Sequence, residues 1–406
     1  MRSLLIVLLV AVSILSPGQF VYQEEGYNPI HTSAWYLQFA PDARSVGAGE
    51  SGVASSPDLF SMFWNPAKFA FIEDRIGIAV SFSDYLWMNM MWKFNDKMDM
   101  STGFNTFHAS MKIKKRSALA FSFTYFDALN EITFTDEFGQ ELGTYKPYDL
   151  NLDVAYSLRL TSNFSAAVAT RYIYSNLGMF QFNNGTEVKP AQSMAFDLAV
   201  YYQKPLELGS KEGEIRWGID LSNIGMKMSY VEDVGDEEFL PANLRLGAGF
   251  TYKFDNRNSL SVQFDANKLQ VPTTPYYLRD SLGHPVYDKN NNPVIEKGMD
   301  PDVSVVKGMV QSWYDAPGGF EEEIHEWAVA GGFEYRYKTF FSARSGIFYE
   351  HKIKGNRRYY TAGAGFKAGI FGMDLGLKFP IDRALKDDYI SIFYLRTSIA
   401  IGIPKK

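Results

Sequence analysis

Residues 148–160, YDLNLDVAYSLRL, decide the fold class of this 406-residue chain. From Leu150 onward every second residue is apolar, and the residues between are polar, charged or small. Successive side chains of a β-strand point to opposite faces, so this stretch reads as one strand with two unlike faces. One face would carry Leu150, Leu152, Val154, Tyr156, Leu158 and Leu160. The other would carry Asn151, Asp153, Ala155, Ser157 and Arg159.

The same two-residue period recurs along the chain, most clearly in residues 242–254 and 372–379. It predicts an all-β protein with about fourteen strands, most of them about ten to thirteen residues long. Soluble strands are typically about five or six residues long, whereas a tilted membrane-spanning strand needs about ten. The predicted strands start near Ile76, Gly103, Arg116, Tyr148, Ser162, Ser193, Gly213, Ala242, Asn258, Ile324, Thr339, Tyr359, Ile370 and Asp388.

The predicted connections alternate in length. Those after even-numbered strands are tight turns, at residues 114–116, 160–162, 255–257 and 337–339. Most of those after odd-numbered strands are long, at residues 128–147, 175–192, 223–241 and 269–323. Bacterial outer-membrane barrels have an even strand number, short periplasmic turns and long extracellular loops. A soluble barrel has no reason to sort its loops in this way. The sequence therefore predicts an antiparallel outer-membrane β-barrel over residues 76–402, with both termini in the periplasm.

Charged residues near the middle of the predicted strands fall on the face opposite the apolar stripe. Arg or Lys facing lipid at mid-membrane costs roughly 2–4 kcal/mol, so this face should line the interior. The charges have mixed sign, which favours an ion-paired wall around a plug over a selective ion path. They are Arg159, Arg171, Asp197, Arg216, Asp220, Arg245, Asp265, Arg344, Lys367, Asp374 and Arg396.

The N-terminus predicts export. Arg2 is followed by an apolar run from Leu4 to Leu15, and Ser16-Pro17-Gly18 offers small residues for a signal peptidase. We expect residues 1–18 to be a signal peptide cleaved after Gly18; a buried N-terminal element is the alternative. The chain has no cysteine, which excludes disulfides, thiolate metal sites and a cysteine nucleophile. Its net charge of −6 lacks the basic excess that nucleic-acid binding requires.

Residues 19–75 do not alternate and are expected to form a plug region ahead of the barrel. Residues 47–52, GAGESG, formally fit G-x-G-x-x-G. No apolar strand precedes them, and Ser55-Ser56-Pro57 follows where a phosphate-binding helix would have to start. A glycine-rich turn packed inside a barrel is the better interpretation.

This region also carries a family resemblance. Residues 41–58 include PDAR, two glycines at 47 and 49, GVA and SPD, and residues 64–68 read WNPAK just before the first strand. With about fourteen strands to follow, the chain resembles the FadL-like outer-membrane proteins, and within them the PorV (LptO) family of the type IX secretion system of Bacteroidota. The resemblance implies structural roles in the plug for a set of motif residues. They are Pro41, Asp42, Arg44, Gly47, Gly49, Asn65, Pro66 and Ala67.

The same resemblance implies a function at the cell surface. Family members bind the C-terminal signal domain of secreted cargo proteins at the translocon SprA (Sov), and pass the cargo to an attachment complex that contains the sortase-like PorU. They have no enzymatic activity and no cofactor. Three alternatives stay open: a FadL-like transporter of hydrophobic small molecules, the related component PorQ and, more weakly, an outer-membrane lipase.

The connection after the first predicted strand is the candidate partner-binding surface. Residues 86–100 hold five of the 15 methionines and two of the seven tryptophans. Methionine with aromatic residues makes an adaptable apolar contact surface. An aromatic girdle at the membrane interface is the alternative interpretation. The candidate residues are Trp87, Met88, Met90, Met91 and Trp92.

No other pattern predicts chemistry. Asp288, Asn290 and Asn292 have the spacing of a calcium loop, but Pro293 stands where that loop requires glycine. The acidic run at residues 232–238 reads as a solvated loop. The five histidines have no serine or carboxylate at an informative spacing. We therefore expect no metal site and no catalytic site.

Overall fold

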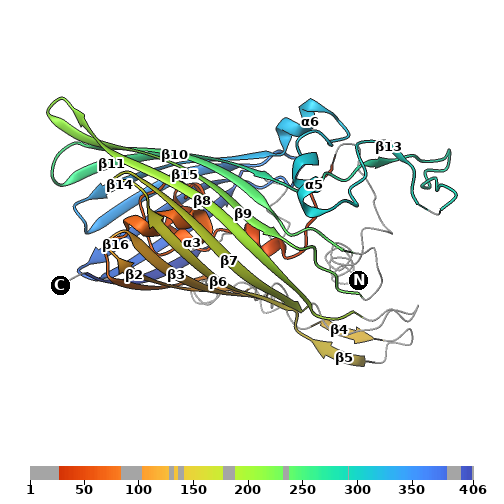
Figure 1. Ribbon diagram of the computed structural model, residues 1–406, viewed down its shortest axis with the longest axis horizontal. Coiled ribbons are helices and arrows are strands. Elements are labelled where there is room, and N and C mark those ends of the chain that lie inside the picture. The colour runs from red at the N-terminus through yellow and green to blue at the C-terminus, as the bar shows by residue number, and fades with distance from the viewer. Residues whose placement is uncertain are drawn as a thin grey trace.

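The computed structural model of the chain is a closed barrel of fourteen antiparallel strands, shown in Figure 1. It describes residues 27–83, 103–127, 132–135, 141–176, 188–231, 237–290, 292–381 and 395–404. The barrel strands are β1 (Ile76–Ser83), β2 (Gly103–Lys114), β3 (Ser117–Asp127), β6 (Tyr148–Arg159), β7 (Phe164–Asn176), β8 (Ala191–Leu208), β9 (Lys211–Gly225), β10 (Asn243–Lys253), β11 (Asn258–Leu269), β14 (Trp327–Tyr337), β15 (Phe341–Tyr349), β16 (Arg358–Ala368), β17 (Phe371–Pro380) and β18 (Arg396–Ile403). The first strand closes the barrel by pairing with the last, from Ile76 opposite Ile403 to Ser83 opposite Arg396.

The fourteen-stranded barrel predicted from the two-residue period is confirmed, and most strands begin within a few residues of the expected position. One start was wrong. Ile324 lies in the helix α6 (Phe320–His325), and the strand begins at Trp327. The start expected at Asp388 lies outside the described residues, and β18 is described from Arg396.

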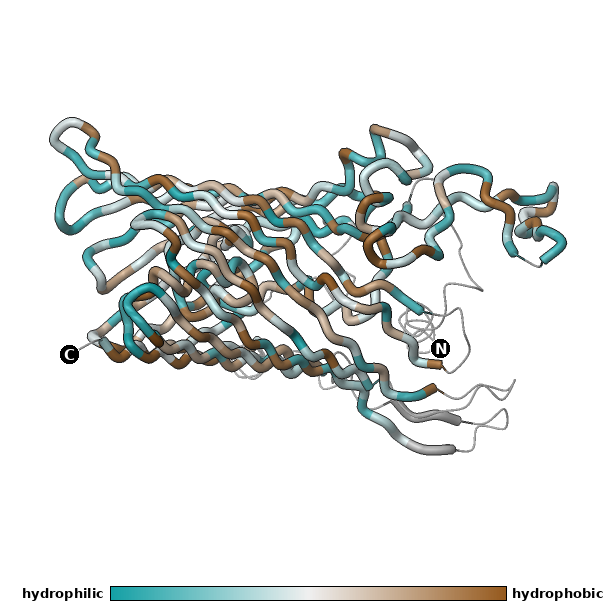
Figure 2. Tube along the Cα trace, in the orientation of Figure 1, coloured by the Kyte–Doolittle hydropathy of each residue, from teal (hydrophilic) through white to brown (hydrophobic). Residues whose placement is uncertain are grey.

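The two faces of the wall differ as the alternation predicts, and Figure 2 shows the hydropathy changing residue by residue along the strands. Apolar side chains such as Val154, Phe264 and Phe333 are exposed on the outside. Most of the inward charges are buried, and several form ion pairs: Arg171 with Asp197 at 3.2 Å, Arg245 with Asp220 at 3.2 Å, and Arg344 with Asp374 at 2.6 Å. Lys367 also lies on the inward row, near the turn end of β16, and is exposed there.

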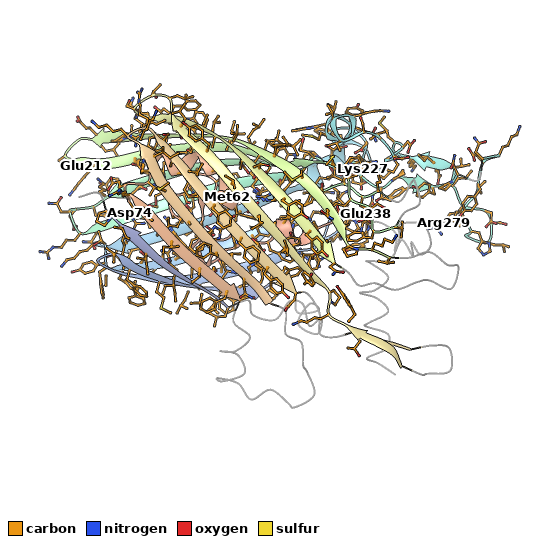
Figure 3. The ribbon with its side chains drawn as sticks, turned by 60° about the horizontal axis from the view of Figure 1, so that its bottom comes forward. Met62, Asp74, Glu212, Lys227, Glu238 and Arg279 are labelled. Carbon is orange, nitrogen blue, oxygen red and sulfur yellow. The ribbon has the colours of Figure 1, made fainter. Side chains whose placement is uncertain are left out.

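The two ends of the barrel are unlike. Short turns join consecutive strands at one end, where Figure 3 places Asp74 and Glu212, and the C-terminus lies there in Figure 1. The long connections and Arg279 lie at the opposite end, which the rule for outer-membrane barrels makes external. These connections contain the hairpin of β4 (Ile132–Thr135) and β5 (Glu141–Tyr145), that of β12 (Tyr276–Tyr277) and β13 (Ile295–Lys297), the helix α5 (Val305–Gln311) and α6. Among the described residues, no helix is long and apolar enough to cross a membrane.

Residues 40–72, here called the inner segment, lie inside the barrel. They contain α2 (Ala43–Gly47), α3 (Ser61–Trp64) and the 3-10 helix η2 (Pro66–Phe71), and η1 (Trp35–Gln38) precedes them. The helix α2 packs against β15 to β18, and η2 packs against β3, β6, β7 and β8. Nearly all side chains of the inner segment are buried. Its apolar residues therefore form the core of the protein together with small residues of the wall, such as Ala155 and Ala169.

Candidate functional site

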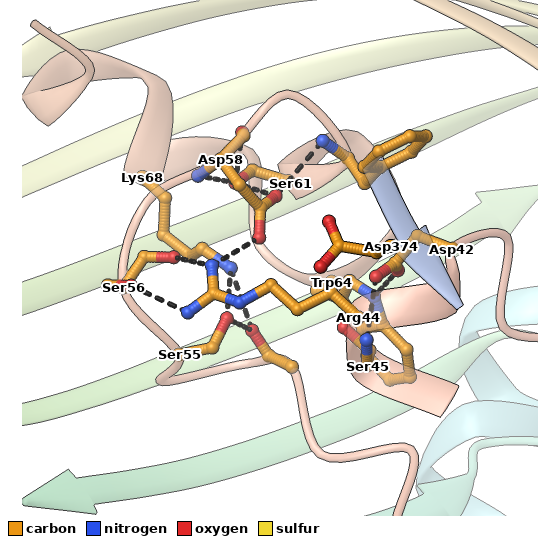
Figure 4. A network of polar contacts seen from close by, with 12 residues as sticks. Asp42, Arg44, Ser45, Ser55, Ser56, Asp58, Ser61, Trp64, Lys68 and Asp374 are labelled. Carbon is orange, nitrogen blue, oxygen red and sulfur yellow. Dashed lines mark hydrogen bonds and ion pairs between the residues drawn. The ribbon is translucent and has the colours of Figure 1, made fainter. Parts of the chain in front are cut away.

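Asp42 holds two parts of the inner segment together. It precedes α2, and its carboxylate accepts a hydrogen bond of 2.7 Å from the backbone N–H of Ser45, a typical N-cap. The other carboxylate oxygen accepts 2.7 Å from the indole N–H of Trp64 in α3. Figure 4 shows both contacts. One buried carboxylate therefore fixes the start of α2 relative to the end of α3.

Arg44 joins the inner segment to the barrel wall. Its guanidinium contacts Asp58 at 2.9 Å within the inner segment (Figure 4) and Glu334 of β14 at 3.0 Å. Glu334 also accepts from Arg344 at 2.7 Å, and Arg344 reaches Asp374 of β17. A planar guanidinium with several fixed donors suits such a branched set of carboxylates. The result is a continuous ion-paired network that spans three strands and the inner segment.

Two glycines allow the inner segment to approach the wall closely. A Cβ on Gly47 would lie 2.8 Å from the Cα of Gly363 in β16. Gly49 has a φ of 76°, and its Cβ would lie 2.4 Å from the carbonyl oxygen of Gly331 and 2.8 Å from the backbone N of Ile347. Neither position has room for the Cβ atom of a larger residue. The G-x-G spacing thus serves backbone packing.

The Asn-Pro-Ala motif fixes the other end of the inner segment. The side-chain oxygen of Asn65 accepts from the N–H of Ala67 at 3.0 Å and caps η2, while its amide donates to the carbonyl of Val200 in β8 at 2.9 Å. Pro66 is the first residue of η2, where a missing N–H costs nothing. The carbonyl of Ala67 accepts from Ser157 at 3.0 Å and Ser165 at 2.8 Å. At the start of the segment, Arg396 donates to the carbonyl of Pro41 at 3.2 Å.

The candidate partner-binding residues Trp87, Met88, Met90, Met91 and Trp92 lie outside the described residues. The structure does describe the strands on either side of them. β1 ends at Ser83 and β2 begins at Gly103, and both positions are at the external end of the barrel.

A second ionic cluster lies at the external rim, where the connection 270–326 returns to the wall. Lys354 contacts Glu322 at 2.6 Å and Glu326 at 3.0 Å, and Lys268 of β11 contacts Glu323 at 3.2 Å and also Glu326. Burial acts to raise the pKa of Glu322, but the hydrogen bond and charge of Lys354 outweigh it and lower that pKa. Nothing in the sequence predicts this cluster, because lysine and glutamate residues at these distances along the chain form no motif.

Asp315 of the same connection contacts no cation among the described residues. Asp315 accepts from the backbone N–H of Thr273 at 3.1 Å, and burial raises its pKa to about 7, with Glu326 and Glu323 acting in the same direction.

A hairpin turn in this connection explains the calcium-like spacing of Asp288, Asn290 and Asn292. Asp288 accepts from the backbone N–H groups of Asn290 at 2.8 Å and Asn292 at 2.9 Å, as a turn requires.

Two small cavities lie inside the described part of the barrel. One of about 50 Å³ lies near the external end beside Arg245, Glu326 and Lys354, and one of about 20 Å³ lies beside His108 and Arg171. Pockets for small-molecule ligands are typically about 300–1,000 Å³, whereas these two have room for a few waters.

Comparison with known proteins finds one family model and several distantly similar solved structures. A family model described as type IX secretion system protein PorV matches residues 22–276. The toluene transporter TbuX of Ralstonia pickettii is 10% identical, with 90% of this chain and 98% of that chain covered and a TM-score of 0.47. A Pseudomonas aeruginosa FadL homologue is 12% identical, with 93% and 99% covered and a TM-score of 0.41. At these identities and scores the likeness says nothing about substrate. No curated protein matches the sequence.

Proposed function

The chain belongs to the family of the type IX secretion system protein PorV, and from this premise we propose that it binds the C-terminal signal domain of secreted cargo outside the cell. It is an outer-membrane component of that secretion system. In the proposal it receives cargo at the translocon SprA (Sov) and carries it to the attachment complex that contains PorU. The match over residues 22–276 carries this proposal, because it includes the inner segment and the strands from β1 to β11.

The occupied interior supports a role at the external surface. An apolar molecule crossing the barrel would have to pass buried ion pairs such as Arg44 with Glu334 and Arg171 with Asp197. Separating a buried ion pair without replacing the partner is strongly unfavourable. This weighs against the alternative of a FadL-like transporter for hydrophobic small molecules. The proposal assigns no reaction to the chain.

We place the cargo contact on the connection between β1 and β2. Its residues Trp87, Met88, Met90, Met91 and Trp92 combine aromatic area with flexible thioethers, which suits a surface that must accept several partners. Both flanking strand ends are external, which supports a contact with cargo on the outside of the cell.

The test is affinity purification from outer membranes in mild detergent, followed by identification of the bound proteins. A variant with Trp87, Met90, Met91 and Trp92 changed to Ser should fold but recover less cargo. The matched control changes Leu282 and Tyr287, which are exposed on another external connection, to Ser and should recover cargo normally. Unchanged recovery by the first variant would refute the contact surface. Fatty acids bound by the unaltered protein, with no cargo, would refute the proposed function and favour a transporter.

A further inference from the structure

The connection 270–326 folds over the outside of the barrel wall at its external rim. Lys268 pairs across the sheet with Leu244 of β10 and Trp327 of β14, so these three side chains leave the wall on the same face. Phe264 stands on the same row of β11 and is 52% exposed. That row is the lipid-facing one. A lysine in it should be exposed to the lipid headgroups.

Lys268 is instead only 1% exposed, because the connection covers it. Its ammonium contacts Glu323 and Glu326 and lies 5.8 Å from the ring centroid of Trp313. Trp313 packs edge-on against Trp327, with the ring centroids 6.0 Å apart, and its indole N–H donates to Gln270 at 2.8 Å. These contacts fix the chain between α5 and α6 against the lipid-facing side of the wall.

The surface that α5 and α6 leave uncovered is mostly apolar. Six large side chains of residues 304–324 are between 46% and 81% exposed. Only two exposed residues in this stretch are charged, Lys307 and Glu321. The neighbouring hairpin differs, since Arg279, Asp280 and Lys289 are among its exposed residues. The six apolar residues are Val306, Val310, Trp313, Tyr314, Phe320 and Ile324.

We propose that this surface, residues 305–324, lies in the outer leaflet of the membrane, at the membrane–water interface beside β11 and β14. It contacts Trp327, the first residue of β14, at the external end of the lipid-facing side, and Trp and Tyr are the residues that gather at the membrane–water boundary. Figure 1 shows α6 projecting beyond the strands at the external end. Amphipathic helices lie in this boundary with the apolar face toward the acyl chains and the polar face toward water.

The natural absence of cysteine makes the test direct. Single Val310→Cys and Phe320→Cys variants are labelled with a nitroxide and reconstituted in vesicles of phosphatidylethanolamine and phosphatidylglycerol. Collision with oxygen, which concentrates in lipid, is compared with collision with a water-soluble nickel chelate. Phe264→Cys gives the lipid reference and Leu282→Cys gives the water reference. Heat-modifiable migration in gels shows that each labelled variant holds a folded barrel.

We expect the labels at positions 310 and 320 to collide preferentially with oxygen, as the label at 264 does. Preferential collision with the nickel chelate, as at position 282, would overturn the proposal and leave the apolar surface free for a protein partner. The measurement involves neither cargo nor translocon. Its failure would therefore leave the proposed secretion function standing.

Discussion

Gly47 of the inner segment lies against Gly363 of β16 so closely that a Cβ on either residue would stand 2.8 Å from the Cα of the other. The contact is between two backbones, and neither can yield as the end of a flexible side chain can. It brings α2 against the wall next to the ion pairs of Arg44. The helix α2 is therefore held against the wall both by the close packing of Gly47 and by the ion pairs of Arg44.

Gly47→Ala should destabilise the folded barrel by about 1–3 kcal/mol, the usual cost of forcing a methyl group into a filled site. The measurement is the free energy of unfolding in urea, followed by tryptophan fluorescence in lipid vesicles. Gly372→Ala in β17 is the matched control, because the nearest atoms to its added Cβ are 3.9 Å away. Equal stability of the two variants would show that the inner segment does not pack against β16 as described.

Arg44→Met should destabilise the protein by about 3 kcal/mol, since it removes the guanidinium that contacts both Asp58 and the buried Glu334. The same unfolding measurement applies. Lys253→Met is the control: Lys253 contacts Glu212 at 2.8 Å, but the two side chains are 51% and 72% exposed. Exposed pairs contribute less than about 1 kcal/mol. A loss no larger than the control's would mean that the network is not intact in the membrane.

Phe264→Arg should cost roughly 2–4 kcal/mol, because position 264 lies midway along β11 and faces lipid. Phe254→Arg lies beside the turn between β10 and β11, where the cost should fall to about 0–1 kcal/mol. Stability is measured by unfolding from vesicles of defined lipid. If the two arginines cost the same, the membrane does not cross the strands at the depth proposed.

The strands were predictable because each carries its own evidence. The alternation within residues 148–160 needs no knowledge of the neighbouring strands, so boundaries and faces could be assigned locally. The partners of the inner segment were not predictable, because Arg44 and Glu334 are far apart in sequence and no spacing relates them. The motif around Gly47 and Gly49 indicated a packed turn, but the opposing Gly363 and Gly331 could come only from the structure.

The error at Ile324 has a comparable cause. The sequence from Ile324 into β14 has the pattern of one continuous strand. In the structure, Glu322, Glu323 and Glu326 form ion pairs with Lys268 and Lys354, and the chain forms the helix α6 at this point. By its register position in β11, Lys268 falls on the lipid-facing row. The alternation could not show that the connection 270–326 returns to cover that side chain.

Asp315 should make the connection 270–326 more stable as the pH falls. Its ordinary pKa is 3.8, and burial raises it to about 7 in the folded protein. Between these values the folded connection retains the proton that the unfolded connection loses, so rising pH costs stability across this window, and the cost is complete above about pH 7. Hydrogen exchange of residues 270–326 should therefore be slower at about pH 5.5 than at about pH 8, after correction for the intrinsic rate.

Asp315→Asn isolates this effect, because the amide stays neutral and its oxygen can still accept from Thr273. His351 acts in the opposite direction. Burial and the stacked ring of His325, 3.6 Å away, lower the pKa of His351, so acidification favours the unfolded connection there. Both proteins retain that histidine, and its contribution cancels in their difference. The unaltered protein should gain more protection on acidification than the variant; an equal gain in both would mean that Asp315 is ionised throughout the range.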